Sequence, residues 1–266
     1  MAESGQLEEV LQIRVHGSPA QPTIIYLPGT HGDWTLVSGL RNRLQPDFCF
    51  VEFTYPRTTS WSLEDYAAHI RTALSEQGIE RGWLLGESFG SQIGWLLANP
   101  RADGFRCEGI ILVGGFARHP FPWGVDLAIW SFHKLIRLQA TIERVMMLYA
   151  WWVRHFYEAT PEAEISVQNF IERRTQKDGL AAIHRLRLLR DNHPQAIVEQ
   201  LQDIPVFSLS GFWDVLVPWY LVNPCLRRHC PGYREAKVIG TGDHNVLFST
   251  PTKSARTIRE WLGRVA

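Results

Sequence analysis

The sequence predicts an α/β protein built on a mostly parallel, doubly wound sheet with an inserted all-helical lid. Short apolar runs alternate with amphipathic helical patterns over most of the 266 residues, which is typical of βαβ units. These apolar runs are continuous, so helices are expected to cover both faces of the sheet. The alternation stops once, where only helical patterns occur. We therefore expect a core of residues 1–116 and 201–266 and a helical lid of residues 117–200.

Five strands are predicted before the lid, at residues 11–15, 23–27, 48–53, 83–85 and 109–113. Three helices are expected between them. The first has leucines four residues apart over residues 36–44, which places one apolar stripe on one face. The second begins after Ser62, which with Asp65 resembles a capping box. The third covers residues 91–98.

The lid and the rest of the core follow. Within the lid, helical patterns are expected at residues 125–157, after Thr160 with Pro161 at the first helical position, and at residues 180–190, with a turn at 176–179 before the last. Beyond the lid, strands are expected at residues 204–209 and 236–239, and helices at 218–228 and 253–262.

A Gly-Glu-Ser-Phe-Gly motif ends the strand predicted at 83–85 and is followed at once by a helical pattern. Strand, sharp turn and helix are the context in which Gly-x-Ser-x-Gly presents a nucleophile. The two glycines allow a strained backbone, and the following helix N-terminus favours developing negative charge. Ser88 is therefore predicted to be a nucleophile, and the alternative is a turn without chemical consequence.

A serine nucleophile needs a base, and the base needs a carboxylate that orients it. Functional groups of a parallel sheet gather in loops after the strands. The loop after residues 204–209 offers Asp214, and the loop after 236–239 offers His244. Asp243 is the alternative acid, but consecutive residues on a tight loop rarely point at one another. Glu87 is expected to be a hydrogen-bonding group beside the nucleophile.

The chain resembles the α/β-hydrolase superfamily with a helical lid. The resemblance rests on Gly-Glu-Ser-Phe-Gly, Gly-Phe-Trp-Asp-Val-Leu-Val-Pro and Gly-Asp-His-Asn, and on the serine, acid, histidine order. It implies Ser88 as nucleophile, His244 as base and then acid, and Asp214 as the orienting carboxylate. It also implies an oxyanion hole formed by the backbone N–H groups of Phe89 and Thr30. Pro-Gly stands where the family often has His-Gly, so the histidine that follows Thr30 is expected either to line the site or to cap a turn.

This resemblance implies a serine hydrolase that cleaves an ester-like bond of a small apolar substrate through an acyl-enzyme on Ser88. Thioesters, amides and carbon–carbon bonds beside a carbonyl remain alternatives, as does a catalytically silent ligand-binding member of the fold. Aromatic residues are frequent in the lid, and Trp123, Trp130 and Trp213 are assigned as substrate-contacting candidates.

Composition limits the partners. Lys+Arg and Asp+Glu both number 27, which gives no electrostatic case for nucleic acid. Cys225 and Cys230 stand beside His229 but lack the second pair of a zinc site, so neither a metal nor a cofactor is expected. We expect a cytoplasmic monomer or homodimer without a signal peptide or stable membrane insertion, although residues 129–157 offer an alternative in which the helix lies on lipid.

Overall fold

The computed structural model describes residues 10–101, 104–135, 151 and 161–265. Seven strands form one sheet in the order β1-β3-β2-β4-β5-β6-β7. β1 is antiparallel to β3, and every other neighbouring pair is parallel, which confirms the predicted mostly parallel sheet. The strands are β1 (Gln12–His16), β2 (Thr23–Leu27), β3 (Cys49–Thr54), β4 (Arg81–Glu87), β5 (Arg106–Val113), β6 (Val206–Gly211) and β7 (Tyr233–Ile239).

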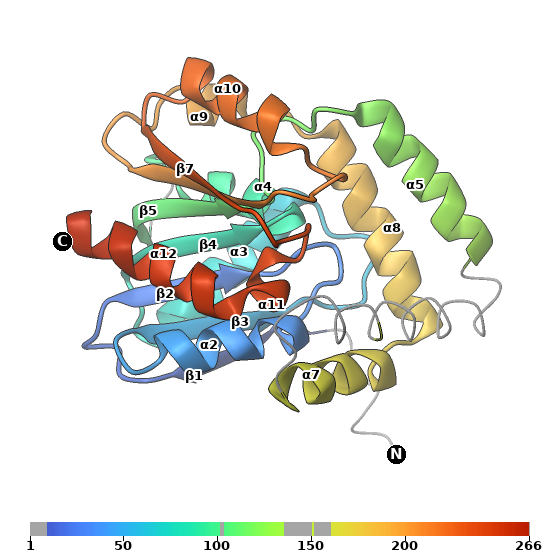
Figure 1. Ribbon diagram of the computed structural model, residues 1–266, viewed down its shortest axis with the longest axis horizontal. Helices are drawn as coiled ribbons and strands as arrows, with labels where there is room; N and C mark the ends of the chain where they lie inside the picture. The colour runs from blue at the N-terminus through green and yellow to red at the C-terminus, as the bar shows by residue number, and fades with distance from the viewer. Residues whose placement is uncertain (1–9, 102–103, 136–150, 152–160, 266) are drawn as a thin grey trace.

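Helices cover both faces of the sheet (Figure 1). One face packs against α2 (Ser38–Leu44), α11 (Val246–Ser249) and α12 (Pro251–Val265), with the short 3₁₀ turn η1 (Thr35–Val37) beside them. The opposite face packs against α3 (Leu63–Glu76), α4 (Phe89–Leu97) and α10 (Trp219–His229). The chain is therefore doubly wound, as predicted.

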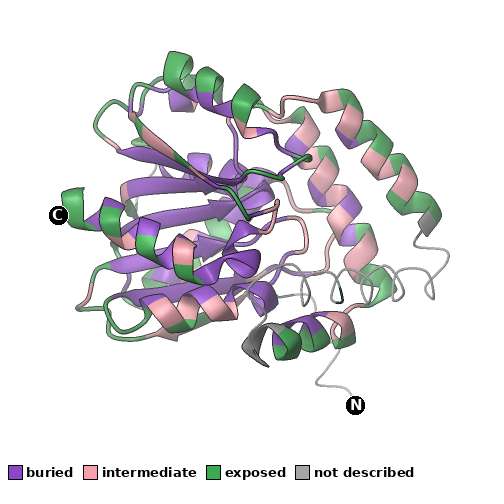
Figure 2. Cartoon of the chain, in the orientation of Figure 1, coloured by how far each residue is buried: buried purple, intermediate pink, exposed green. Residues whose placement is uncertain are grey.

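β2 shows why the strands read as continuous apolar runs. Ile25 and Leu27 pack into the apolar cluster on the α3 and α4 side, whereas Ile24 and Tyr26 pack into the cluster on the α2 and α12 side. All four are buried, because successive strand residues point to opposite faces and both faces are covered. The burial map shows the same pattern, with a buried sheet between helices whose outer faces are exposed (Figure 2).

Within the described part of residues 117–200, every regular element is helical. These elements are α5 (Pro122–Leu135), α7 (Pro161–Glu172), α8 (Gln176–Asp191) and α9 (Gln195–Val198). The predicted helix over residues 125–157 starts earlier, at Pro122. Its later part lies outside the described residues except for Trp151, which is helical, and Thr160 also lies outside them.

The turn predicted at residues 176–179 is wrong, because these residues form the first turn of α8. The backbone N–H of Thr175 donates to Oδ2 of Asp178 at 2.7 Å, and the Thr175 hydroxyl donates to the same oxygen at 3.0 Å. These bonds fix the start of the helix and outweigh the helix-breaking tendency of Gly179. α4 also begins earlier than predicted, at Phe89 directly after Ser88.

One buried arginine joins α8 to the core. The guanidinium of Arg185 donates to the carbonyl oxygens of Thr30 at 3.0 Å and Pro56 at 2.9 Å. Its Nε donates to the hydroxyl of Tyr66 at 3.3 Å. Thr30 follows β2 and Pro56 follows β3, so α8 lies across the carboxyl ends of these strands (Figure 1). In the part of the chain that the structure describes, no helix is long and apolar enough to cross a membrane.

Candidate active site

Ser88 occupies the sharp turn between β4 and α4. Its φ of 48° and ψ of −112° make it the one non-glycine residue with positive φ in the described part of the chain. Such a conformation costs an L-residue about 1–3 kcal/mol and persists only where surrounding contacts impose it. The Ser88 N–H donates to the carbonyl of Val113 at 2.9 Å, which ties the turn to the end of β5.

The two glycines of the motif are required by close packing. A Cβ on Gly90 would lie 2.0 Å from the carbonyl oxygen of Leu27, and one on Gly86 would lie 2.9 Å from the Cα of Ser91. Neither position can hold a larger residue without moving backbone. The glycine at position 90 therefore allows the first turn of α4 to pack directly against the backbone at the end of β2, and this packing fixes the turn at Ser88.

His244 and Asp214 form a hydrogen-bonded pair at the carboxyl ends of β7 and β6. Nδ1 of His244 lies 2.9 Å from Oδ2 of Asp214, and it must donate because an ionised carboxylate only accepts. Oδ1 of Asp214 accepts from the backbone N–H groups of Leu216 at 3.1 Å and Val217 at 2.8 Å. The Asp214 side chain is fully buried, so its loop holds it in one orientation.

The alternative acid faces elsewhere. Oδ1 of Asp243 accepts from the backbone N–H of Asn245 at 3.0 Å, and burial raises the pKa of its carboxyl. Asp243 thus caps its own loop, whereas His244 pairs with Asp214 from a different strand.

The pKa of His244 is raised above its ordinary value. Burial would lower it, but the charge of Asp214 and the hydrogen bond between the two side chains outweigh that effect. The pair therefore stabilises the imidazolium, the species that a general base becomes after it takes a proton.

Gly114 joins this pair to the serine turn. It directly follows Val113, the acceptor for the Ser88 N–H, and has a φ of +50°. A Cβ at this position would lie 3.1 Å from Oδ2 of Asp214 and 3.1 Å from Cε1 and Nδ1 of His244. Asp214 and His244, the other two members of the predicted triad, thus fill the space that a side chain at position 114 would occupy.

The loop after β2 passes over the first turn of α4. A Cβ on Gly90 would lie 2.8 Å from the carbonyl oxygen of Pro28. The loop closes with a bond from the N–H of Gly32 to the carbonyl of Gly29 at 3.0 Å. Arg185 binds the carbonyl oxygen of Thr30, and this bond fixes the orientation of Thr30 within the loop.

His31 caps this loop. Its Nε2 donates to the carbonyl of Asp33 at 3.0 Å, and burial lowers its pKa, so the ring is neutral at pH 7. Glu87 lies nearby, with Oε2 3.9 Å from Nε2 of His31, and accepts a short hydrogen bond from the hydroxyl of Tyr26. Burial and the charge of Glu87 raise the pKa of Tyr26 well above its ordinary value, so the phenol keeps its proton. The prediction that Glu87 is a hydrogen-bonding group beside the serine is confirmed.

From the sequence, His119 is one of the histidines without ligand spacing, most of which are expected to be surface or structural residues. It lies in the loop after β5, and burial together with the charge of His244 lowers its pKa to about 4. Its Nδ1 accepts from the N–H of Phe121 at 3.1 Å, so the neutral ring carries its proton on Nε2. Its position in a loop after a parallel strand, like those of Asp214 and His244, is the sequence signal that could have marked it as a site residue.

The three tryptophans that are predicted to contact substrate are all exposed. Trp123 is 69% exposed and Trp130 56% exposed on α5, and Trp213 is 63% exposed beside Asp214. Their role stays a prediction. Among the residues that the structure describes, no group of three His, Cys, Asp or Glu side chains is arranged to hold a metal ion.

Comparison with known proteins places the fold. A family model described as the alpha/beta hydrolase family matches residues 15–263. The chain is similar to an esterase from Thermogutta terrifontis with malate bound, at 19% identity and a TM-score of 0.74 over 96% of this chain and 93% of that one. It is also similar to the esterase EaEST from Exiguobacterium antarcticum, at 14% identity and a TM-score of 0.74 over 95% of each chain.

A bromoperoxidase from Bacillus anthracis is similar at 12% identity and a TM-score of 0.73 over 95% of each chain. At these identities the likeness shows the fold alone. No curated protein sequence matches the chain.

The pKa of His244 generates a prediction about pH. Because its folded pKa is raised, the pair with Asp214 stabilises the native state fully below the unfolded value of about 6.5, and this gain is lost as pH rises through the folded pKa. In Asp214→Asn the charge and the hydrogen bond of Asp214 are lost while burial continues to lower the pKa, so the pKa of His244 should fall even though Glu87 and Asp243 still raise it. An NMR titration of the imidazole measures this. Asp243→Asn should lower the pKa far less, and an equal or larger fall in that variant would contradict the pairing.

Gly114→Ala is predicted to disturb the site more than the fold. An alanine held at this positive φ should lower the unfolding free energy by about 1–2 kcal/mol, and the added Cβ should displace Asp214 or His244. Displacement of this size should slow covalent labelling of Ser88 roughly 10- to 100-fold. Gly78→Ala is the matched control, since Gly78 has a φ of +68° but nothing within 4 Å of its Cβ position. Equal labelling rates in the two variants would show that Gly114 has no role at the site.

Proposed function

The chain belongs to the alpha/beta hydrolase family, and we propose on this basis that it is a serine hydrolase that cleaves an ester-like bond through an acyl-enzyme on Ser88. One observation carries the proposal: the hydrogen-bonded pair of His244 and Asp214 contacts Gly114, the residue next to the one that binds the Ser88 N–H. The proposed nucleophile, acid and base thus follow β4, β6 and β7 of one sheet, and Gly114 follows β5, the strand between β4 and β6.

In the proposed reaction, the Ser88 hydroxyl attacks the carbonyl carbon of the substrate while His244 accepts its proton. Asp214 keeps the proton of His244 on Nδ1, which leaves Nε2 as the base. The N–H groups of Phe89 and Thr30 would stabilise the oxyanion. His244 then protonates the leaving alcohol, and a water molecule activated by His244 hydrolyses the acyl-enzyme.

Phe89 fits its role because first-turn N–H groups of a helix have no acceptor within that helix. Thr30 fits the role of second oxyanion donor because Arg185 binds its carbonyl oxygen. This bond restrains the loop that passes over the first turn of α4. The raised pKa of His244 supports a base that holds the transferred proton during the reaction.

The loop that carries the acid supports an apolar substrate. Asp214 points inward and is buried, whereas its neighbours Trp213 and Val215 are exposed, as are Phe212 and Leu216. Together with the exposed tryptophans of α5, these side chains offer apolar surface on the elements around the site. Burying each methylene of a substrate against such surface is worth about 0.8 kcal/mol.

The nucleophile is tested by a fluorophosphonate probe, which forms a covalent bond to an activated serine. The wild-type protein should be labelled at one residue, and Ser88→Ala should abolish both labelling and ester turnover. Ser75→Ala, at an exposed serine of α3, serves as the control and should be labelled at the wild-type rate. Labelling of another serine, or turnover by Ser88→Ala, would refute the proposed mechanism.

The substrate class is tested with p-nitrophenyl esters of increasing acyl length, beside matched thioesters and amides. We predict that kcat/KM rises from acetyl to at least butyryl or hexanoyl esters, up to about fourfold for each methylene that is fully buried. Trp123→Ala, Trp130→Ala and Trp213→Ala should flatten this rise wherever the removed ring contacts the acyl chain. A preference for acetyl esters would refute the apolar substrate, and a preference for amides or thioesters would change the bond that is cleaved.

A further inference from the structure

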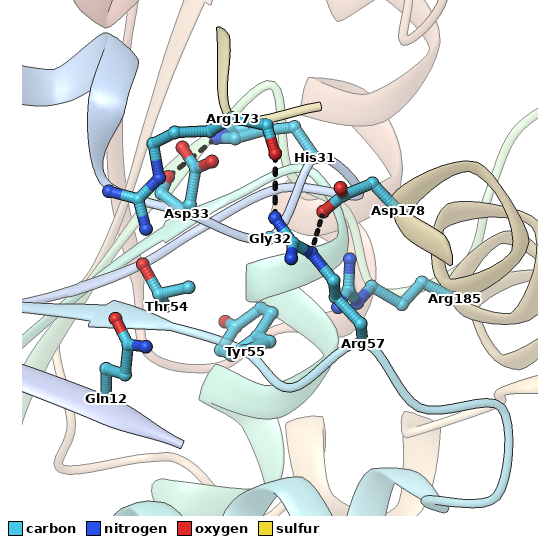
Figure 3. Close-up of a pocket in the computed structure, with 10 residues that line it drawn as sticks. All are labelled: Gln12, His31, Gly32, Asp33, Thr54, Tyr55, Arg57, Arg173, Asp178 and Arg185. Atoms are coloured by element: carbon cyan, nitrogen blue, oxygen red, sulfur yellow. Dashed lines mark hydrogen bonds and ion pairs between the residues drawn. The ribbon is translucent and has the colours of Figure 1, made fainter. Parts of the chain in front are cut away.

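A cavity lies behind the loop that carries Thr30, between the core and the junction of α7 and α8 (Figure 3). Its volume is about 180 Å³. His31, Gly32 and Asp33 of the loop form one wall, and the remaining lining residues are Gln12, Thr54, Tyr55, Arg57, Arg173, Asp178 and Arg185. Neither Ser88 nor His244 lines it.

Two hydroxyl groups on its wall have no hydrogen-bond partner among the residues that the structure describes. The hydroxyl of Tyr55 and Oγ1 of Thr54 are both buried and unpaired. Tyr55 as a residue is 2% exposed, and burial raises its pKa well above its ordinary value, so the phenol keeps its proton and can donate. Buried polar atoms nearly always have a partner, so two orphans around one cavity indicate a ligand or bound water.

The charges around this cavity do not balance. Arg57 pairs with Asp178 at 2.9 Å, and Arg174, which lies next to the cavity, pairs with both Asp33 and Asp178. These pairs occupy the two carboxylates that line the cavity.

Arg185 donates only to neutral oxygens, those of Thr30, Pro56 and Tyr66. Arg173 stacks on Trp34, with 5.5 Å between its guanidinium carbon and the ring centroid, and pairs with no carboxylate in the described part of the chain. Two guanidinium groups therefore form no ion pair with a carboxylate of the described residues, and His31 contributes no further positive charge because its lowered pKa leaves it neutral at pH 7.

We propose that this cavity binds one small oxyanion, a carboxylate or a phosphate. Arg173 would form charge-assisted hydrogen bonds to it, and the hydroxyls of Tyr55 and Thr54 would donate to its remaining oxygens. The buried charge of Arg185 contributes attraction through a medium of low polarity. A volume of about 180 Å³ accommodates such an anion, since each water displaced occupies about 30 Å³.

The site is distinct from the proposed catalytic machinery but is connected to it. Three residues of the loop after β2 line the cavity, and Arg185 both lines it and holds the carbonyl of Thr30. A bound anion would therefore restrain the loop that supplies the second proposed oxyanion donor. Because the ligand binds the folded protein alone, it should also raise the melting temperature.

Isothermal titration calorimetry with inorganic phosphate and with succinate, at low and constant ionic strength, tests the proposal. Wild-type protein should bind at least one of the two anions saturably, with one site per chain. The anion that binds more tightly shows whether the site prefers a phosphate or a carboxylate. Arg173→Gln and Tyr55→Phe should each weaken binding about tenfold or more. Tyr55→Phe keeps the ring that packs against Phe89, so it separates the hydroxyl from the fold.

Arg14→Gln is the matched control. Arg14 also stacks on Trp34, at 4.1 Å, but is exposed and does not line the cavity, so the variant should bind with wild-type affinity. An anion could also enter the proposed oxyanion hole, so the titration is repeated after Ser88 has been blocked by the fluorophosphonate, or in Ser88→Ala if the probe does not react. Binding should persist in either case. The proposal would be overturned by any of three results: no saturable binding, wild-type affinity in Arg173→Gln and Tyr55→Phe, or loss of binding when Ser88 is blocked.

Discussion

The site depends on one backbone constraint: Ser88 is held at a φ of 48°, a conformation that residues with a side chain avoid. The restraint comes from packing, because α4 approaches the end of β2 so closely that only glycine fits at position 90. β2, β4 and β5 are neighbours in the sheet, so the elements that restrain Ser88 also carry Thr30 and Gly114. The geometry of the site is therefore a property of the central strands rather than of the loops alone.

Buried charge is the second organising feature. Arg174 and Arg185 bind the backbone of the loop after β2 from the helical insertion, and the carboxylates of Asp33 and Asp178 balance only part of the charge in this region. Burying a guanidinium is costly unless its donors are satisfied, and Arg185 satisfies them with carbonyl oxygens at strand ends. The insertion and the core thus share an electrostatic network as well as an apolar contact.

The sequence allowed much of the fold to be predicted, because strands buried on both faces read as apolar runs and the motif at Ser88 has a fixed context. It also allowed the contact between Asp214 and His244 to be anticipated, since loops after parallel strands meet at one edge, whereas the grouping of Ser88 with them stays a prediction. The role of Arg185 in joining α8 to the core could not be predicted, because its acceptors lie more than 100 residues away in the sequence. A single arginine in a helical pattern is ordinarily expected to be exposed. The positive φ of Gly114 and the start of α8 at Gln176 likewise depend on contacts that composition does not reveal.

The hydrogen bonds by which Arg185 joins α8 to the core constrain one side of the contact more than the other. Two of its three acceptors are main-chain carbonyls, at Thr30 and Pro56, and every amino acid supplies that group. Selection on this contact therefore acts on position 185 and leaves the side chains at positions 30 and 56 free to drift. The loop after β2 can therefore accept other side chains while Arg185 still attaches the helical insertion to it through the main chain.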